Sequence, residues 1–293
     1  MKLSQRLALT YYRTKIHTIG LVSPRKAAEM AFELFCTPRK PKKKLKEPPI
    51  FHKAEKLTLK LGNISIAGFR FHSQQPNGKK ILILHGFSSY SYKFEKYVSL
   101  FKKQGFEVVC FDAPAHGLSE GKIINALIYK DAILKIEANF GPFYGLMGHS
   151  LGGLAGALAF KEFNDQANRR LVMVAPAVRT QRAIEHFYTL LPVEEKIRVA
   201  INQLFNEITQ LPIEEISINH ALKHIQSPIL WIHDRDDKIC IFDDVLSIMN
   251  EKPEHIRFVI TEGLGHSRIY KEASTSNAID HFFRICDEIK LSI

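Results

Sequence analysis

Ser150 has the sequence setting that most clearly predicts chemistry. It is the centre of Gly148-His149-Ser150-Leu151-Gly152, a G-x-S-x-G pentapeptide. The apolar segment 143–147 precedes it and the small-residue segment 153–159 follows it, which predicts a strand, a sharp turn and a helix. Such a turn presents the serine hydroxyl at the carboxyl end of the strand. The N-terminus of the helix directs backbone N–H groups at any negative charge that develops nearby. We therefore interpret Ser150 as a nucleophile rather than as an ordinary turn serine.

A base and a carboxylate are needed to activate a serine hydroxyl, and two later loops supply candidates. His266 follows a predicted strand in a Gly-Leu-Gly-His-Ser sequence. Asp234, Asp236 and Asp237 share the loop after the preceding strand. We favour Asp237 as the acid, with Asp236 second, and expect the other two carboxylates to be solvated or to cap a helix. Each candidate lies just past the end of a strand, where open α/β sheets place their sites.

Two backbone N–H groups are candidates for an oxyanion hole. His85-Gly86-Phe87 follows the first buried parallel strand, and this turn can direct the N–H of Phe87 at the point that the N–H of Leu151 faces. Each such donor contributes roughly 100- to 1000-fold in rate. We expect the ring of His85 only to brace the loop. The residues predicted to line a substrate pocket are Phe87, His149, Phe187 and Tyr188.

Hydrophobic periodicity predicts an α/β fold. Its mostly parallel sheet of about eight strands carries helices on both faces, and the hairpin at Gly62-Asn63 forms an antiparallel edge. Strands are predicted at 56–61, 64–71, 80–85, 106–111, 143–148, 170–176, 228–233 and 256–261. Helices are predicted at 4–19, 24–36 (capped by Ser23), 92–104, 122–139, 151–163, 241–250 and 274–290.

Residues 179–223 interrupt the alternation of strands and helices. They read as helices only, broken by Pro192 and Pro212, and they carry apolar stripes. Apolar stripes usually indicate core packing. Because this segment follows the carboxyl end of a strand, we predict instead that it is a helical lid inserted over the site.

Positive charge is concentrated at the N-terminus. Residues 1–56 hold 14 Lys/Arg and 4 Asp/Glu of a chain whose formal net charge is +11. The remainder is close to neutral, which argues against nucleic acid as a partner. We predict a basic helical arm with a Pro/Lys linker over residues 1–50, followed by one catalytic domain over 51–293. We favour an arm that packs on the body, with weak contact to anionic membrane as the alternative.

The four cysteines are widely scattered and form no CxxC pair, and Cys110 lies inside an apolar strand. No metal-ligand spacing occurs among the cysteines and histidines, so we expect no metal ion. Basic residues interrupt the first twenty positions, and the sequence contains no apolar run of transmembrane length. The sequence thus predicts a cytoplasmic, reduced protein, and it leaves the oligomeric state open.

Together these motifs resemble the α/β-hydrolase superfamily over residues 56–293. The resemblance rests on His85-Gly86-Phe87, on the segment 112–119, on the pentapeptide around Ser150, and on the Asp237 and His266 loops. The segment 112–119 (Asp-Ala-Pro-Ala-His-Gly-Leu-Ser) is similar to the superfamily's D-x-P-G-H-G-x-S turn. Ala115 replaces the first glycine there, which costs turn freedom. Asp234 stands where the superfamily usually has glycine after histidine.

The resemblance implies serine esterase chemistry on a small-molecule acyl substrate, with no metal or organic cofactor required. His266 would accept the proton of Ser150, Asp237 would orient His266, and Phe87 and Leu151 would bind the oxyanion. A carboxylic ester or thioester with a small or apolar acyl group is the leading interpretation. The alternatives are cleavage of a peptide, amide or C–C bond by the same triad, and a non-catalytic, membrane-associated binding protein on the same fold.

Overall fold

The β-sheet determines where the loops that carry the motifs can meet. The structure, a computed structural model, describes residues 3–39 and 45–288. Eight strands form one sheet in the order β1-β2-β4-β3-β5-β6-β7-β8, in which β1, β2 and β4 pair antiparallel and the other neighbours pair parallel. Their bounds are β1 Glu55–Leu61, β2 Ile64–Phe71, β3 Lys80–Leu84, β4 Glu107–Phe111, β5 Gly145–His149, β6 Arg170–Val174, β7 Ile229–Asp234 and β8 Ile256–Thr261.

The predicted fold class and the predicted antiparallel edge are therefore confirmed. The hairpin turns at Gly62-Asn63, and Gly62 has φ +58°. Strands β5, β6 and β7 are buried along their whole length, as expected of central parallel strands covered on both faces. This rigid centre fixes the positions of the loops at its carboxyl edge.

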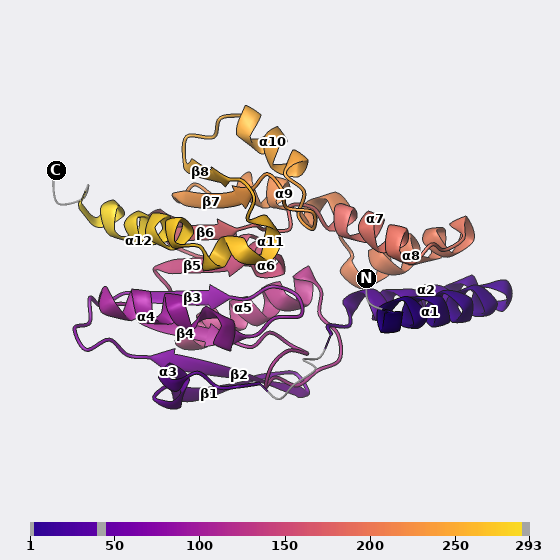
Figure 1. Ribbon diagram of the computed structural model, residues 1–293, viewed down its shortest axis with the longest axis horizontal. Coiled ribbons are helices and arrows are strands. Elements are labelled where there is room, and N and C mark those ends of the chain that lie inside the picture. The colour runs from indigo at the N-terminus through magenta and orange to yellow at the C-terminus, as the bar shows by residue number, and fades with distance from the viewer. Residues whose placement is uncertain (1–2, 40–44, 289–293) are drawn as a thin grey trace.

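Helices cover both faces of the sheet (Figure 1). One cluster of buried apolar residues joins the sheet to α5, α6 and α10, and another joins it to α3, α4 and α12. The α-helices are α1 Leu3–Val22, α2 Pro24–Cys36, α3 Pro49–His52, α4 Glu95–Lys103, α5 Ala126–Phe140, α6 Leu151–Phe160, α7 Thr180–Leu190, α8 Glu195–Thr209, α9 Ile218–Leu222, α10 Asp243–Asn250, α11 Gly265–Arg268 and α12 Ala273–Glu288. Single 3₁₀ turns are η1 Ser91–Phe94, η2 Gln166–Asn168, η3 Ile213–Glu215 and η4 Ile269–Lys271.

The helix boundaries follow the capping residues. Ser23 caps α2 by accepting a hydrogen bond from the N–H of Lys26, as predicted. The helix expected over 122–139 begins only at Ala126, because Asn125 caps it through the N–H of Ile128. The short helices α3 and α11 were not expected from the sequence. None of the helices in the described ranges combines the length and the apolar character that crossing a membrane requires.

The N-terminal helices pack on the helical insertion, residues 179–223. In Figure 1, α1 and α2 lie beside α7 and α8, on the side toward which β3 points its carboxyl end. Ion pairs join Arg25 to Glu207 at 2.7 Å and His17 to Glu194 at 2.7 Å. Residues 40–44 of the predicted linker lie outside the described residues, and the division into an arm and a domain stays a prediction.

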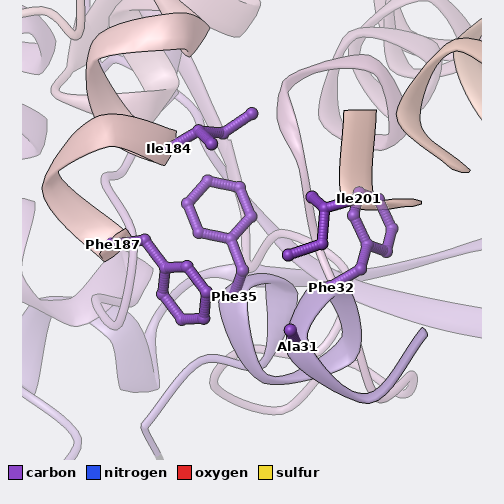
Figure 2. Close-up of a pocket in the computed structure, with 6 residues that line it drawn as sticks. All are labelled: Ala31, Phe32, Phe35, Ile184, Phe187 and Ile201. Atoms are coloured by element: carbon purple, nitrogen blue, oxygen red, sulfur yellow. The ribbon is translucent and has the colours of Figure 1, made fainter. Parts of the chain in front are cut away.

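A small apolar cavity marks the contact between α2 and the insertion. Figure 2 shows the ring of Phe35 lying between the side chains of Ile184 and Phe187. Phe35 and Phe187 make an edge-to-face contact with ring centroids 5.4 Å apart. The cavity lining is entirely apolar and comes from both segments: Ala31, Phe32, Phe35, Ile184, Phe187 and Ile201. The arm and the insertion thus share one apolar interface.

Candidate active site

Ser150 lies in the strained turn between β5 and α6. Its backbone has φ 55° and ψ −121°, in a region that L-residues seldom adopt. A side chain at Gly148 would collide with the backbone of Gly152 and Gly153, so the turn requires glycine there. The N–H of Ser150 donates to the carbonyl of Val174 on the neighbouring strand β6 at 3.2 Å. The turn is therefore fixed by its close packing on α6 and by the bond to β6. The side chain of Ser150 lies at the carboxyl edge of the sheet.

The structure brings Ser150, His266 and Asp237 together in one chain of hydrogen bonds. His266 Nε2 lies 3.0 Å from Ser150 Oγ, and His266 Nδ1 lies 2.7 Å from Asp237 Oδ2. The three residues follow β5, β8 and β7, whose carboxyl ends meet at one edge. The geometry is that of a nucleophile, a base within proton-transfer reach and a carboxylate that orients the base.

Asp237 is held as an ionised carboxylate. It is buried, and burial by itself raises the pKa of a carboxyl group. The hydrogen bond and the charge of His266 oppose this effect, as do the N–H groups of Ile239 and Cys240, which donate to Oδ1 at 2.8 and 3.0 Å. Both carboxylate oxygens thus accept hydrogen bonds, and the net effect holds the pKa of Asp237 below its usual value.

The other two aspartates of this loop clamp the histidine loop in place. Asp234 is fully buried and accepts hydrogen bonds from the N–H groups of Leu264 and Gly265 at 3.1 and 2.9 Å. Its Oδ2 also accepts from the hydroxyl of Thr261 at 2.6 Å. Asp236 accepts from the N–H of Gly263 at 2.8 Å. The expectation that these carboxylates would be solvated or helix-capping is wrong for Asp234, because the backbone donors of the next loop converge on it.

The turn that carries Phe87 lies against Ser150. A Cβ atom added at Gly86 would stand 2.9 Å from Ser150 Cβ, so only glycine allows this close approach. His85 braces the turn, as expected: its Nδ1 donates to the carbonyl of Gly86 and its Nε2 accepts from the N–H of Ala113, each at 2.9 Å. The turn therefore lies close to Ser150, and the oxyanion role of Phe87 and Leu151 stays a prediction.

The segment 112–119 supports the same turn from the other side. His116 Nε2 accepts from the N–H of Ser88 at 2.9 Å, and Asp112 accepts from the N–H of Ser91 at 2.7 Å. Ala115, which replaces the glycine of the superfamily motif, adopts φ +66°. Because a Cβ atom is disfavoured in this region, Ala115 holds a strained conformation that glycine would adopt freely. The motif therefore acts as a scaffold for the turn after β3.

The four predicted pocket residues lie in different places. Phe87 lies in the turn after β3, and its side chain is 40% exposed. His149 is buried, its Nε2 donates to the carbonyl of His266 at 3.1 Å, and its ring packs on that of His266. Phe187 lines the cavity against α2, and Tyr188 packs under the guanidinium of Arg198. His149 thus supports the base, a role that the sequence did not indicate, and the pocket assignment stays a prediction.

Cys240 is a further side chain at the nucleophile that the sequence analysis missed. Its thiol lies within 4.8 Å of donor atoms of Asp237 and His266, and burial raises the pKa of the thiol. Within the described ranges, donor atoms of Asp237, Cys240 and His266 lie within 4.8 Å of one another and could hold a metal ion. Asp237 and His266, however, are already hydrogen-bonded to each other in the geometry that proton transfer needs. The only sequence signal that Cys240 lies near the site is its position three residues after Asp237.

Comparison with known proteins agrees with this fold. A family model described as serine aminopeptidase, S33, matches residues 75–210. A protein of Mycoplasma genitalium inferred to be an esterase/lipase is 24% identical, with 71% of this chain and 89% of that protein covered. Mouse α/β-hydrolase domain-containing protein 10 superposes with a TM-score of 0.58 at 19% identity, covering 82% of this chain and 100% of the mouse chain. A Pyrococcus furiosus esterase superposes with a TM-score of 0.61 at 18% identity, covering 85% and 97%.

The sheet topology and the similar solved structures define the fold of the protein. The chain has the α/β-hydrolase fold, as its motifs predict. Members of one superfold catalyse many reactions, so the particular activity has to be argued from the site itself.

Proposed function

We propose that the protein is a serine hydrolase that cleaves a carboxylic ester or thioester of a small or apolar acyl group through an acyl-enzyme intermediate. The single observation that carries the proposal is the continuous hydrogen-bond chain from Ser150 through His266 to Asp237. The esterase names of the similar proteins support a hydrolase.

In the proposed mechanism His266 transfers the proton. Ser150 Oγ attacks the carbonyl carbon while its proton passes to His266 Nε2, and Asp237 stabilises the imidazolium that results. The N–H groups of Phe87 and Leu151 hold the tetrahedral oxyanion. When the intermediate collapses, the leaving alcohol or thiol takes the proton from His266. A water molecule then attacks the acyl-serine by the same route, which releases the carboxylic acid and restores the hydroxyl.

The side chains around the site favour an apolar substrate. Phe87, Leu118 and Ile239 follow β3, β4 and β7, and all three are exposed at the carboxyl edge of the sheet. In the proposal these three side chains contribute to one apolar binding surface. In the proposal they contact the acyl part as it approaches Ser150, and the helical insertion serves as the lid.

A second candidate function is cleavage of an amide or peptide bond by the same triad. The match to the serine aminopeptidase family model favours it. The geometry of Ser150, His266 and Asp237 serves both reactions, so only the leaving group distinguishes them.

Two experiments test the proposal. A fluorophosphonate probe should label the wild-type protein and should not label Ser150→Ala. Initial rates on matched esters, thioesters and aminoacyl amides, across a series of acyl lengths, should show faster cleavage of the esters and thioesters. Labelling that persists in Ser150→Ala would contradict the serine mechanism, and faster amide cleavage would favour the second candidate.

A further inference from the structure

The outer face of α1 exposes large apolar side chains in one stripe. Leu7, Tyr11, Leu21 and Val22 are between 59% and 90% exposed. At 100° per residue these positions fall within an arc of about 100° on the helix. They make up a third of the exposed large apolar side chains in the described ranges, although α1 is a single helix. The stripe is defined here by these four residues.

The stripe is not the packing face of α1. Ile16 and Gly20 are buried on the opposite side of the helix, and Gly20 approaches Ile197 of α8 so closely that a side chain there would collide. His17 also pairs with Glu194 at the start of α8. Because α1 packs on α8 through its inner face, the outer stripe is left exposed in the described part of the chain.

The charge around the stripe has one sign. No Asp or Glu occurs before Glu29 in the sequence. Arg6 and Arg13 flank the stripe on one side and Lys15 on the other, and all three are exposed. Exposed apolar residues bordered by Arg and Lys on a surface helix are the features that bind the headgroup region of an anionic bilayer.

We propose that the outer face of α1 docks on an anionic lipid bilayer. The segment after α2 contacts the turn after β3, since the N–H of Arg39 donates to Ser88 Oγ at 2.9 Å. A bilayer on α1 would lie at the end of the molecule where α1 and α2 stand beside α7 and α8 of the insertion (Figure 1). That this placement delivers an acyl lipid to Ser150 rests on the proposed function, whereas the docking itself does not.

Co-sedimentation with vesicles tests the docking without using activity. The full chain should bind vesicles of phosphatidylcholine mixed with phosphatidylglycerol, should bind phosphatidylcholine alone far more weakly, and should be released by high salt. Arg6→Gln, Arg13→Gln and Lys15→Gln together should weaken binding about 100-fold. Leu7→Ser, Tyr11→Ser and Val22→Ser together should weaken it at least about tenfold.

A control variant removes the same charge from another surface. Lys53→Gln, Lys56→Gln and Lys60→Gln together lie at β1 and should leave vesicle binding within about twofold of wild type. Circular dichroism should show that every variant is folded. Ser150→Ala should bind vesicles like wild type, so failure of the proposed activity would not affect this result.

Three outcomes would overturn the docking proposal. The first is equal binding to both kinds of vesicle. The second is an equal loss of binding in the β1 control and in the α1 charge variant. The third is binding to RNA or to a second copy of the chain, measured by filter binding and sedimentation velocity, that is abolished by the α1 substitutions while vesicle binding is unaffected.

Discussion

Asp234 and Gly265 are joined by a 2.9 Å hydrogen bond from the N–H of Gly265 to Oδ1 of the buried carboxylate. This bond fixes the loop after β8 to the loop after β7. It also connects Asp234 to the backbone next to His266, because Gly265 immediately precedes His266. Asp234 touches neither Ser150 nor His266 through its carboxylate, so its role is to position the base.

Replacing Asp234 should weaken both stability and catalysis. Asp234→Ala leaves the N–H groups of Asp236, Leu264 and Gly265 without their acceptor, so we expect a loss of at least about 3 kcal/mol in the free energy of unfolding. We also expect a lower kcat in the folded fraction. Urea denaturation and initial rates measure the two effects. The exposed Asp131→Ala is the control, with a change within about 0.5 kcal/mol.

Asp237→Asn should abolish most of the activity and leave the fold intact. The amide keeps the shape of the side chain, but it cannot stabilise the imidazolium of His266, so we expect kcat/KM to fall about 10⁴-fold. Rates on an activated ester, with the melting temperature as the fold check, make the measurement. Asp236→Asn in the same loop should cost less than about tenfold. Retention of more than a tenth of the activity in Asp237→Asn would mean that the acid lies elsewhere.

Gly86→Ala should disable the nucleophile by displacing the turn after β3. The added methyl would stand 2.9 Å from Ser150 Cβ and 3.0 Å from His149 Nδ1. We expect the rate of fluorophosphonate labelling to fall at least about 100-fold, because the oxyanion donors and the hydroxyl no longer fit one geometry. Ser89→Ala in the same turn is the matched control. An unchanged labelling rate would show that the turn does not contribute to the site.

Acid should destabilise the protein well above the range in which carboxylates titrate. Burial lowers the pKa of both His85 and His116 to about 4, against about 6.5 in the unfolded chain. The unfolded state therefore binds more protons between these values, and stability is lost as the pH falls from about 6.5 toward 4. For His85 alone we expect a loss of about 2 kcal/mol at pH 5.

Urea denaturation at a series of pH values between 7.5 and 5 measures this loss. His52→Gln, at an exposed histidine, is the matched control. Denaturation midpoints that do not move over this range would show that His85 and His116 are not held neutral in the folded state.

Ala115→Gly should stabilise the protein. Relief of the left-handed backbone at φ +66° gains about 1–2 kcal/mol, and the greater freedom of glycine in the unfolded chain offsets about 0.5–1 of it. We expect a net gain of about 0.5–1 kcal/mol by thermal or urea denaturation. Ala157→Gly, in the interior of helix α6, should by contrast destabilise the protein. A loss of stability in Ala115→Gly would contradict the assignment of strain.

Local pattern was sufficient to predict the sheet and the loops of the site. Strand periodicity, the glycines around Ser150 and the order of the Asp237 and His266 loops are all features of short segments, and the fold they predict is the one observed. The role of Asp234 could not be predicted, because its donors come from a loop about thirty residues away. The contact of Phe35 with Phe187 could not be predicted for the same reason, since apolar spacing does not specify a partner.

The long separation of Ser150 from His266, 116 residues along the chain, has a consequence for biosynthesis. Ser150 is translated long before His266, the residue that activates it in the proposed mechanism. Strands β7 and β8, which are followed by the loops of Asp237 and His266, are also translated after the turn at Ser150. A nascent or truncated polypeptide that ends before residue 266 would therefore carry an unreactive hydroxyl, and reactivity would arise only when the last part of translation adds the sheet's final edge.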